Sequence, residues 1–331
     1  MASTAEMSAP SGEGGFFSVS PLMIFPSVMG SFSVYLRQGS EYVLYTGAEE
    51  VFTERHKRVL YENGVREVFV RQKHKESYTR YVEENLGHIL LDDSIPLRER
   101  AGLFYKVSAE ALEDVFESRL PGKVGEEQYD RIHSFVNQAV RFLCLENSLK
   151  AVGEFIAHDY KTYTHCVNVF VYTTTLLQTY GLDEEMLVRC GIGAMLHDVG
   201  KTRIPRLILN KPGKLDPDER RIISKHPTLG LASCTRMPLA QEAMNIILFH
   251  HEKMNGSGYP AGLMAEEIPL PVRVVTIADI YDALTSDRPY ADARRPFEVL
   301  ELMRATMAQD LDMEVFKRFI MMLSGARLVG L

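Results

Sequence analysis

Cysteine is scarce in this sequence, and its four copies lie far apart without a CxxC pair: Cys144, Cys166, Cys190 and Cys234. This spacing argues against a disulfide framework and against thiolate metal ligands. Long hydrophobic runs are also missing, because no apolar stretch approaches the ~18–20 residues that a membrane helix needs. Residues 1–15 lack the basic and apolar regions of a signal peptide. We therefore expect a cytoplasmic protein that is neither secreted nor membrane-spanning.

An excess of basic residues is absent as well. The chain has 37 Lys and Arg against 44 Asp and Glu, a formal net charge of −7. A protein that coats a nucleic acid needs a basic stripe on its surface. We therefore expect no nucleic-acid polymer as a partner, and any positive charge that binds phosphate has to be local.

The length of 331 residues is sufficient for two domains. Residues 1–18 are expected to form a disordered tail, and residues 19–95 a small α/β module. Within this module the pattern predicts strands over 32–38, 42–46 and 65–70 and a helix over 50–63 that Gly64 closes. The module has no haem, flavin or nucleotide motif and no receiver-type phosphoacceptor pattern. We assign it only a regulatory or dimerising role, which includes a homodimer.

From Pro96 onward the pattern is almost wholly helical. It predicts helices over Leu97–Glu117 and Glu126–Leu145, with a break at Leu120–Lys123. Residues 96–150 are expected to form a helical connector that packs on a catalytic domain over 151–331. The predicted fold class is mainly α, an all-helical bundle preceded by the small α/β module.

Histidines gather in the second half of the chain, where six of the ten fall between positions 158 and 251. Helical spacing places His165, His197 and His250 on apolar faces, so that three helices aim imidazoles into one interior. A single histidine on such a face is more often a core residue. Burying the whole set together with two aspartates would be costly without a cation. Ligands limited to His and Asp disfavour structural zinc and favour iron or manganese.

Several motifs occur in order and at characteristic spacing. They are H-D-V-G-K at 197–201, H-P at 226–227, H-H-E at 250–252, G-S-G-Y-P at 256–260 and D-I-Y-D-A-L-T-S-D-R-P-Y at 279–290. Together they resemble the HD-GYP family over roughly residues 155–310. The resemblance implies an HD-type catalytic bundle and a metal-dependent phosphodiesterase. It would hydrolyse cyclic di-GMP to linear pGpG, with further cleavage to GMP left open.

The resemblance also implies the roles of individual residues. The first metal ion would take His165, His197, Asp198 and Asp279. The second would take Asp198, His226, His250 and His251. Asp198 is then the bridge, and a hydroxide held between the two ions, about 3.5–4 Å apart, attacks the phosphorus.

Other residues would contact the substrate. Lys201 and Arg288 would donate to phosphate oxygens, and Gly258 and Tyr259 would border the site. The Gly256–Pro260 loop either meets diguanylate cyclase-type partners or simply ends the helix of His250. Asp282 and Thr285 are expected to support the ligands without direct metal contact.

The sequence departs from the family pattern at four positions. Lys161 stands where some members carry a glutamate for a third metal ion, so two ions are expected. Asn255 replaces the usual aspartate before the first loop glycine, and Lys253 stands where arginine is frequent. Ala291 replaces a basic residue that would contact phosphate.

Three functions stay open on the sequence alone. The first is an active cyclic di-GMP phosphodiesterase. The second is a weakly active or inactive relative that works as a cyclic dinucleotide-binding or signalling module, which Ala291 and Asn255 suggest. The third is an HD hydrolase for another nucleotide, such as cyclic GMP-AMP or guanosine tetraphosphate.

Overall fold

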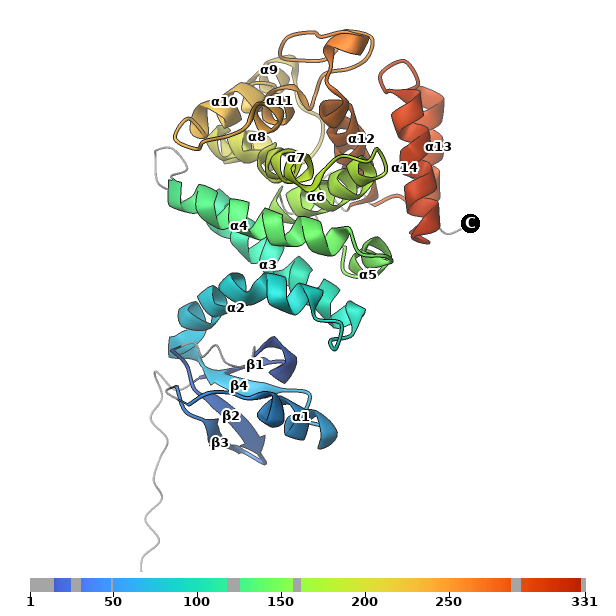
Figure 1. Ribbon diagram of the computed structural model, residues 1–331. Helices are drawn as coiled ribbons and strands as arrows, with labels where there is room; N and C mark the ends of the chain where they lie inside the picture. The colour runs from blue at the N-terminus through green and yellow to red at the C-terminus, as the bar shows by residue number, and fades with distance from the viewer. Residues whose placement is uncertain are drawn as a thin grey trace, which may run out of the picture. The chain divides into compact units, whose positions relative to one another are not determined.

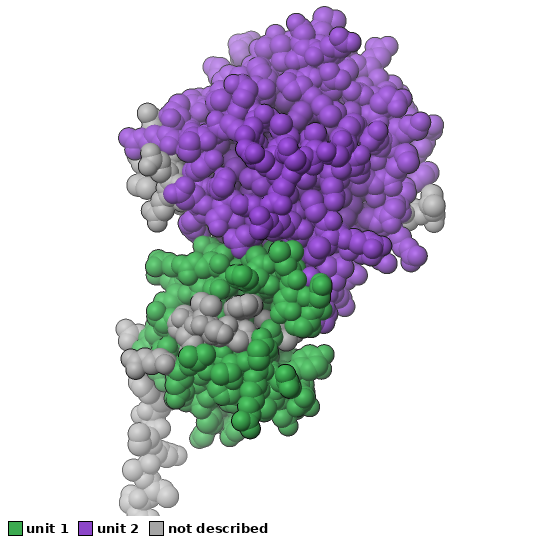
Figure 2. Space-filling model, in the orientation of Figure 1, with its two compact units in different colours: residues 1–95 green, residues 96–331 purple. Residues whose placement is uncertain are grey.

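The computed structural model describes residues 15–24, 31–48, 50–117, 126–156, 162–286 and 293–328. The chain divides into two compact units, residues 1–95 and residues 96–331 (Figure 2). None of the described helices combines the length and the apolar character that a bilayer crossing requires.

The first unit contains a four-stranded antiparallel sheet with the strand order β1-β4-β2-β3 (Figure 1). The strands are β1 (Phe16–Val19), β2 (Val34–Gln38), β3 (Glu41–Thr46) and β4 (Val68–Arg71). The tight turn between β2 and β3 contains Gly39, whose φ of 64° favours glycine. Alternate residues of the sheet are buried, among them Val34, Val68 and Val70.

The helices of this unit are α1 (Glu54–Glu62), α2 (Lys75–Leu91) and the short 3-10 turns η1 (Pro21–Met23) and η2 (Gln72–His74). The α/β character of the module is confirmed. The observed elements β2, α1 and β4 begin a few residues later than the predicted ranges 32–38, 50–63 and 65–70. Two further details differ from the predictions. Residues 16–18, expected in a disordered tail, lie in β1, where they pair with β4, and α2 was not predicted. Its buried face includes Tyr78 and Tyr81, which pack on Phe32.

The second unit is helical, which confirms the predicted fold class. Its first helices are α3 (Leu97–Glu117), α4 (Glu126–Leu143) and α5 (Ser148–Gly153). The expected break at 120–123 lies outside the described residues. Contacts join α3 and α4 to α6 and α7 within this unit, so residues 96–150 lie against the motif-bearing helices (Figure 1).

The motif-bearing part continues through many shorter elements. They are α6 (Thr162–Gln178), α7 (Glu184–Leu196), η3 (Val199–Arg203), α8 (Arg206–Leu209), α9 (Pro217–Ile223), α10 (His226–Ser233), α11 (Gln241–Phe249), η4 (Ala265–Glu267), α12 (Leu270–Thr285), α13 (Pro296–Thr306) and α14 (Met313–Gly325). The helices α6, α7, α11 and α12 pack on one another. They form the core of the unit, and α6 is buried along most of its length.

Candidate metal centre

Five helices deliver the predicted metal ligands to one place. His165 lies on α6 and Asp279 on α12, whereas His226 begins α10. His197 and His250 each occupy the residue that ends a helix, α7 and α11 respectively. Asp198 directly follows His197 in the chain, and His251 directly follows His250. The structure therefore brings all seven predicted ligand residues together, and all but the half-buried His251 are buried.

Gly200 brings two of these segments into contact. A Cβ atom at this position would lie 1.9 Å from the carbonyl oxygen of His226 and 2.5 Å from the amide nitrogen of Gly230. Only glycine lets the η3 turn approach α10 so closely. The glycine of the H-D-V-G-K motif thus places His226 beside Asp198.

The Nδ1 atoms of three histidines face backbone carbonyl oxygens three or four residues earlier in the chain. These contacts are His197 to Ala194 at 2.6 Å, His226 to Ile223 at 2.9 Å, and His250 to Ile246 at 3.1 Å and Ile247 at 3.0 Å. A carbonyl oxygen can only accept, so each Nδ1 carries the hydrogen. The Nε2 atoms of the three rings therefore face the centre of the cluster as potential ligands.

The ring of His165 is oriented in the same way, but the acceptor for its Nδ1–H is a carboxylate and not a backbone carbonyl. Its Nδ1 lies 2.7 Å from Oδ2 of Asp282, and its Nε2 lies 3.0 Å from Oδ1 of Asp279. Asp282 therefore supports the ligand from outside the cluster, as expected from the sequence.

The converging atoms require positive charge between them. Nε2 of His226 lies 3.1 Å from Nε2 of His250, and two neutral rings would there place two lone pairs in contact. Nε2 of His197 is buried without a hydrogen-bond partner among the described residues. Nε2 of His165 and Oδ1 of Asp279, 3.0 Å apart, likewise need a proton or a metal ion between them. These residues fit divalent cations, because imidazole and carboxylate donors suit such ions.

Asp198 lies between two groups of histidines. Its Oδ2 is 3.5 Å from Nε2 of His197 and 3.7 Å from Nε2 of His165. Its Oδ1 is 3.3 Å from Nε2 of His226 and 3.9 Å from Nε2 of His250. Each oxygen of one carboxylate thus faces a different group, which is the arrangement that a bridging ligand needs.

The ligand atoms form two compact sets. Atoms of Asp198, His226, His250 and His251 lie within 4.8 Å of one another, and so do atoms of His165, His197 and Asp279. A third set joins Cys166 to His197 and Asp198. The spacing of the cysteines argued against thiolate ligands, yet Cys166 lies next to these two predicted ligands in space and next to His165 in the chain. Burial raises the pKa of this thiol well above its usual value, so it remains protonated without a metal ion.

The protonation of the cluster favours metal binding. Burial lowers the pKa of His197 and, with His251 and His197 nearby, that of His250 well below the usual value. Burial also lowers the pKa of His251 to about 3. Burial alone would raise the pKa of Asp198, but Lys201 and His197 outweigh it and hold this pKa well below its usual value. At neutral pH the imidazoles of His197, His250 and His251 are therefore neutral and the Asp198 carboxylate is charged, as metal ligands must be.

Lys201 lies on the η3 turn and donates from Nζ to Oδ2 of Asp198. Its side chain is about one-fifth exposed, with a relative accessibility of 19%. The ammonium group therefore lies at the edge of the cluster, partly exposed and within hydrogen-bonding distance of Asp198. It is the described cation nearest to the converging ligands.

The Gly256–Pro260 loop lies against two histidines of the cluster. The Tyr259 ring centroid lies 4.8 Å from that of His251 and 6.5 Å from that of His226. Burial raises the pKa of Tyr259, which therefore keeps its hydroxyl proton. At Gly258 a Cβ atom would lie 2.5 Å from Cα of Glu252. The loop can thus fold back on the H-H-E motif only with glycine at this position.

Two carboxylates hold the segments that flank this loop. The buried Glu252 accepts hydrogen bonds from the backbone N–H groups of residues 261, 262 and 263. Asp310 accepts from Lys253 Nζ at 2.7 Å and from Asn255 Nδ2 at 2.8 Å. The two departures from the family pattern at 253 and 255 therefore share one partner, which the sequence did not indicate.

Three positions singled out in the sequence lie outside the described residues: Lys161, Arg288 and Ala291. Their predicted roles remain predictions from the sequence.

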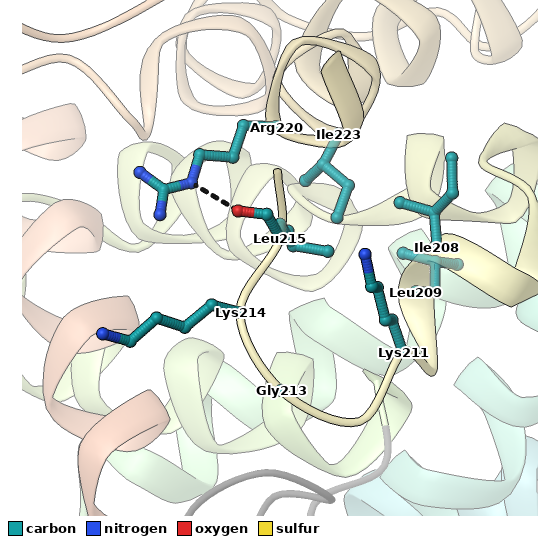
Figure 3. Close-up of a pocket in the computed structure, with 8 residues that line it drawn as sticks. All are labelled: Ile208, Leu209, Lys211, Gly213, Lys214, Leu215, Arg220 and Ile223. Carbon is teal, nitrogen blue, oxygen red and sulfur yellow. Dashed lines mark hydrogen bonds between the residues drawn. The ribbon is translucent and has the colours of Figure 1, made fainter. Parts of the chain in front are cut away.

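A cavity of about 410 Å³ lies apart from the predicted ligands, between α8 and α9 (Figure 3). It is lined by Ile208, Leu209, Lys211, Gly213, Lys214, Leu215, Arg220 and Ile223. Two of its polar groups are already engaged: Lys211 pairs with Glu219, and Arg220 donates to the carbonyl oxygen of Leu215. None of the predicted site residues lines it.

Known proteins are similar in sequence to the second half of this chain. Residues 168–315 match the family model of the HD domain. The chain is similar to the cyclic di-GMP phosphodiesterase PA4108 of Pseudomonas aeruginosa, with 35% identity over 177 residues, 53% of this chain and 42% of that protein. It is also similar to the 3'3'-cGAMP-specific phosphodiesterase 2 of Vibrio cholerae, with 40% identity over 155 residues, 46% of this chain and 29% of that protein. Each match spans less than half of the relative's own length.

A solved structure has a similar fold over nearly the whole chain. It is Bd1817, an HDG"Y"P protein from Bdellovibrio bacteriovorus, with a TM-score of 0.62 and 20% sequence identity over 94% of this chain and 100% of that chain. At this identity the likeness concerns the fold.

Proposed function

We propose that the chain belongs to the HD-GYP family of HD-domain proteins and that it is a metal-dependent phosphodiesterase that hydrolyses cyclic dinucleotides. The relatives that share its HD domain are named as phosphodiesterases of cyclic di-GMP and of 3'3'-cGAMP. Both substrates contain two phosphodiester bonds between nucleosides.

The arrangement of Asp198 among the histidines carries this proposal. One buried carboxylate faces two groups of imidazole nitrogens, whose orientation is fixed by acceptors outside the cluster. We propose two divalent ions, iron or manganese, held by His165, His197, Asp198 and Asp279 on one side and by Asp198, His226, His250 and His251 on the other. Such ions supply a nucleophile near neutral pH and neutralise charge on phosphoryl oxygens.

The residues around the ligands would bind the substrate. Lys201, at the edge of the cluster, would donate to a non-bridging or leaving phosphate oxygen. Arg288 would provide a second, bidentate phosphate contact. Tyr259 would line the mouth of the site with a protonated phenol that can donate a hydrogen bond. The first product from cyclic di-GMP would be linear pGpG.

The described cysteines suit the expected cytoplasmic location. All four are free thiols, of which Cys144 is exposed and Cys166, Cys190 and Cys234 are buried. Burial raises the pKa of Cys190 and that of Cys234 to about 12 in both cases, so both stay protonated.

A second substrate, 3'3'-cGAMP, is supported by the similarity to the Vibrio cholerae enzyme. One experiment separates the alternatives. The purified full-length chain is loaded with Mn²⁺ or Fe²⁺, its metal content is measured, and it is incubated with cyclic di-GMP, 3'3'-cGAMP, pGpG and guanosine tetraphosphate. Products are then separated by chromatography.

Hydrolysis of cyclic di-GMP supports the main proposal, and hydrolysis of 3'3'-cGAMP alone supports the second. Two bound ions with nucleotide binding but no turnover would instead indicate a signalling module. A chain that neither binds metal nor cleaves any of these compounds would refute the proposed function.

A further inference from the structure

A line of buried hydrogen bonds connects the metal centre to helix α3, far outside the motifs. Asp282 accepts from Nδ1 of His165 at 2.7 Å and from Nδ2 of Asn168 at 2.8 Å. Oδ1 of Asn168 in turn accepts from the hydroxyl of Tyr105 at 3.1 Å. The line thus runs from α12 through α6 to α3, and all these helices belong to the same compact unit.

The direction of each hydrogen bond in this line is determined. The Asp282 carboxylate only accepts, so its two oxygens need a donor from His165 and a donor from Asn168. The Asn168 amide must therefore turn its NH₂ group toward Asp282 and its oxygen toward Tyr105. In the reversed orientation the amide oxygen would face the carboxylate oxygen, and the hydroxyl of Tyr105 would face the NH₂ group.

Because these residues are buried, each hydrogen bond of the line depends on its protein partner. His165, Asn168 and Asp282 are each 1% exposed. Water cannot replace a missing partner there, and an unsatisfied buried polar group is costly. Asp282 sets the orientation of the amide, and Tyr105, the outermost member, supplies the donor that the buried Asn168 oxygen then needs.

We propose that Tyr105 and Asn168 are positioning residues of the metal centre. They hold Asp282 as an acceptor for the Nδ1–H of His165, and this fixes the ring so that Nε2 faces Asp198 and Asp279. Binding of a divalent cation by the His165 side of the cluster then depends on a side chain of α3. The inference rests on the metal-binding part of the proposed function and is independent of the substrate.

The first test measures the affinity of the full-length, metal-free chain for Mn²⁺ by calorimetry and counts the bound ions by elemental analysis. Tyr105→Phe removes one hydroxyl and no carbon. Loss of the direct partner of a ligating histidine weakens metal binding by about 10–100-fold. Tyr105 lies two hydrogen bonds beyond that partner, so we expect the lower end, about tenfold, for the weaker-bound ion. Tyr129→Phe is the matched control. It removes the same group from α4, where the Tyr129 ring packs on His133, and it should bind Mn²⁺ like the wild type.

The second test exchanges the amide of Asn168, which donates, with the carboxylate of Asp282, which accepts. Asn168→Asp places two carboxylates against each other, and Asp282→Asn gives an amide that cannot accept from both neighbours. Each single variant should lose one of the two Mn²⁺ ions. In the double variant, the carboxylate introduced at position 168 would accept from Tyr105 and from the new amide at position 282, whose oxygen would accept from His165. Every group then has a partner, and affinity should return to within about tenfold of the wild type.

The outcomes distinguish the two proposals. If the wild type binds two Mn²⁺ ions and Tyr105→Phe binds them equally well, this inference is wrong and the proposed function stands. A folded double variant, checked by circular dichroism, that binds Mn²⁺ no better than either single variant would also overturn it. If the wild type binds no divalent cation, both proposals fail.

Discussion

Replacement of Asp198 tests the two-ion arrangement most directly. Asp198→Ala removes the carboxylate whose two oxygens face different groups of histidines. Each set of ligands would lose one of its four members, and Lys201 would lose its hydrogen-bond acceptor. We therefore expect this single substitution to weaken both ions.

The size of the effect follows from burial. Asp198 is 1% exposed, and removing one partner from a buried charged pair costs about 3–5 kcal/mol. This corresponds to a loss of roughly 10²- to 10⁴-fold in the affinity for each ion. Asp198→Asn retains one oxygen of the same shape and should keep one ion more strongly than the other.

The assay is elemental analysis after loading with Mn²⁺ or Fe²⁺ and removal of free metal on a desalting column. Asp218→Ala is the control, because Asp218 lies on the surface of α9 in an ion pair with Arg221. It should retain two ions. Stoichiometric retention of two ions in Asp198→Ala would refute the bridge, whatever the activity of that variant.

Further predictions concern single positions around the cluster. Lys201→Ala and Arg288→Ala should keep their metal ions and lose rate or affinity by about 10–100-fold, since charge-assisted contacts contribute ~1.5–3 kcal/mol; wild-type kinetics in both would show that the substrate lies elsewhere. Lys161→Glu should create capacity for a third ion by replacing a repelling charge with an oxygen ligand, and three ions in the wild type, measured by elemental analysis, would contradict this. Gly200→Ala should lower the melting temperature and remove the ion held by His226, because a Cβ atom would lie 1.9 Å from a backbone oxygen; unchanged metal content would argue against that role of the glycine. For His251, burial lowers the pKa to about 3, so between pH 3 and about 6.5 the unfolded chain binds more protons and the stability of the metal-free protein should fall as pH falls. Equal urea midpoints at pH 7 and pH 5 would disprove this.

The helices of the metal centre could be predicted because their sequences carry strong local signals. The apolar helix face on which the spacing places His197 belongs to α7 (Glu184–Leu196) in the structure, and Asp183 caps its first turn. Similar spacing predicted α3 over Leu97–Glu117. The weaker alternation around Phe16 and the mixed pattern of residues 75–91 concealed β1 and α2, since those elements depend on packing with the rest of the first unit.

The supporting contacts of the site could not be predicted in the same way. Asn168 and Tyr105 are ordinary residues within helical patterns. They are joined to Asp282 by the packing of α3 on α6 and of α6 on α12. Asp310 likewise comes from the segment between α13 and α14, 55 residues after its partner Asn255. Contacts of this kind depend on tertiary structure, for which a single sequence offers no periodicity.

The chain can keep the hydrogen bond from Tyr105 to Asn168 only if it is divided before residue 105. The HD match begins at residue 168, and the motifs alone suggest a catalytic piece that starts near 151. Such a piece would contain all seven predicted ligand residues and still lack the Tyr105 hydroxyl that donates to Asn168. The compact unit that begins at Pro96 keeps it. Exchange of residues 1–95 for another module would therefore preserve this hydrogen bond, whereas a fusion joint near residue 151 would remove it.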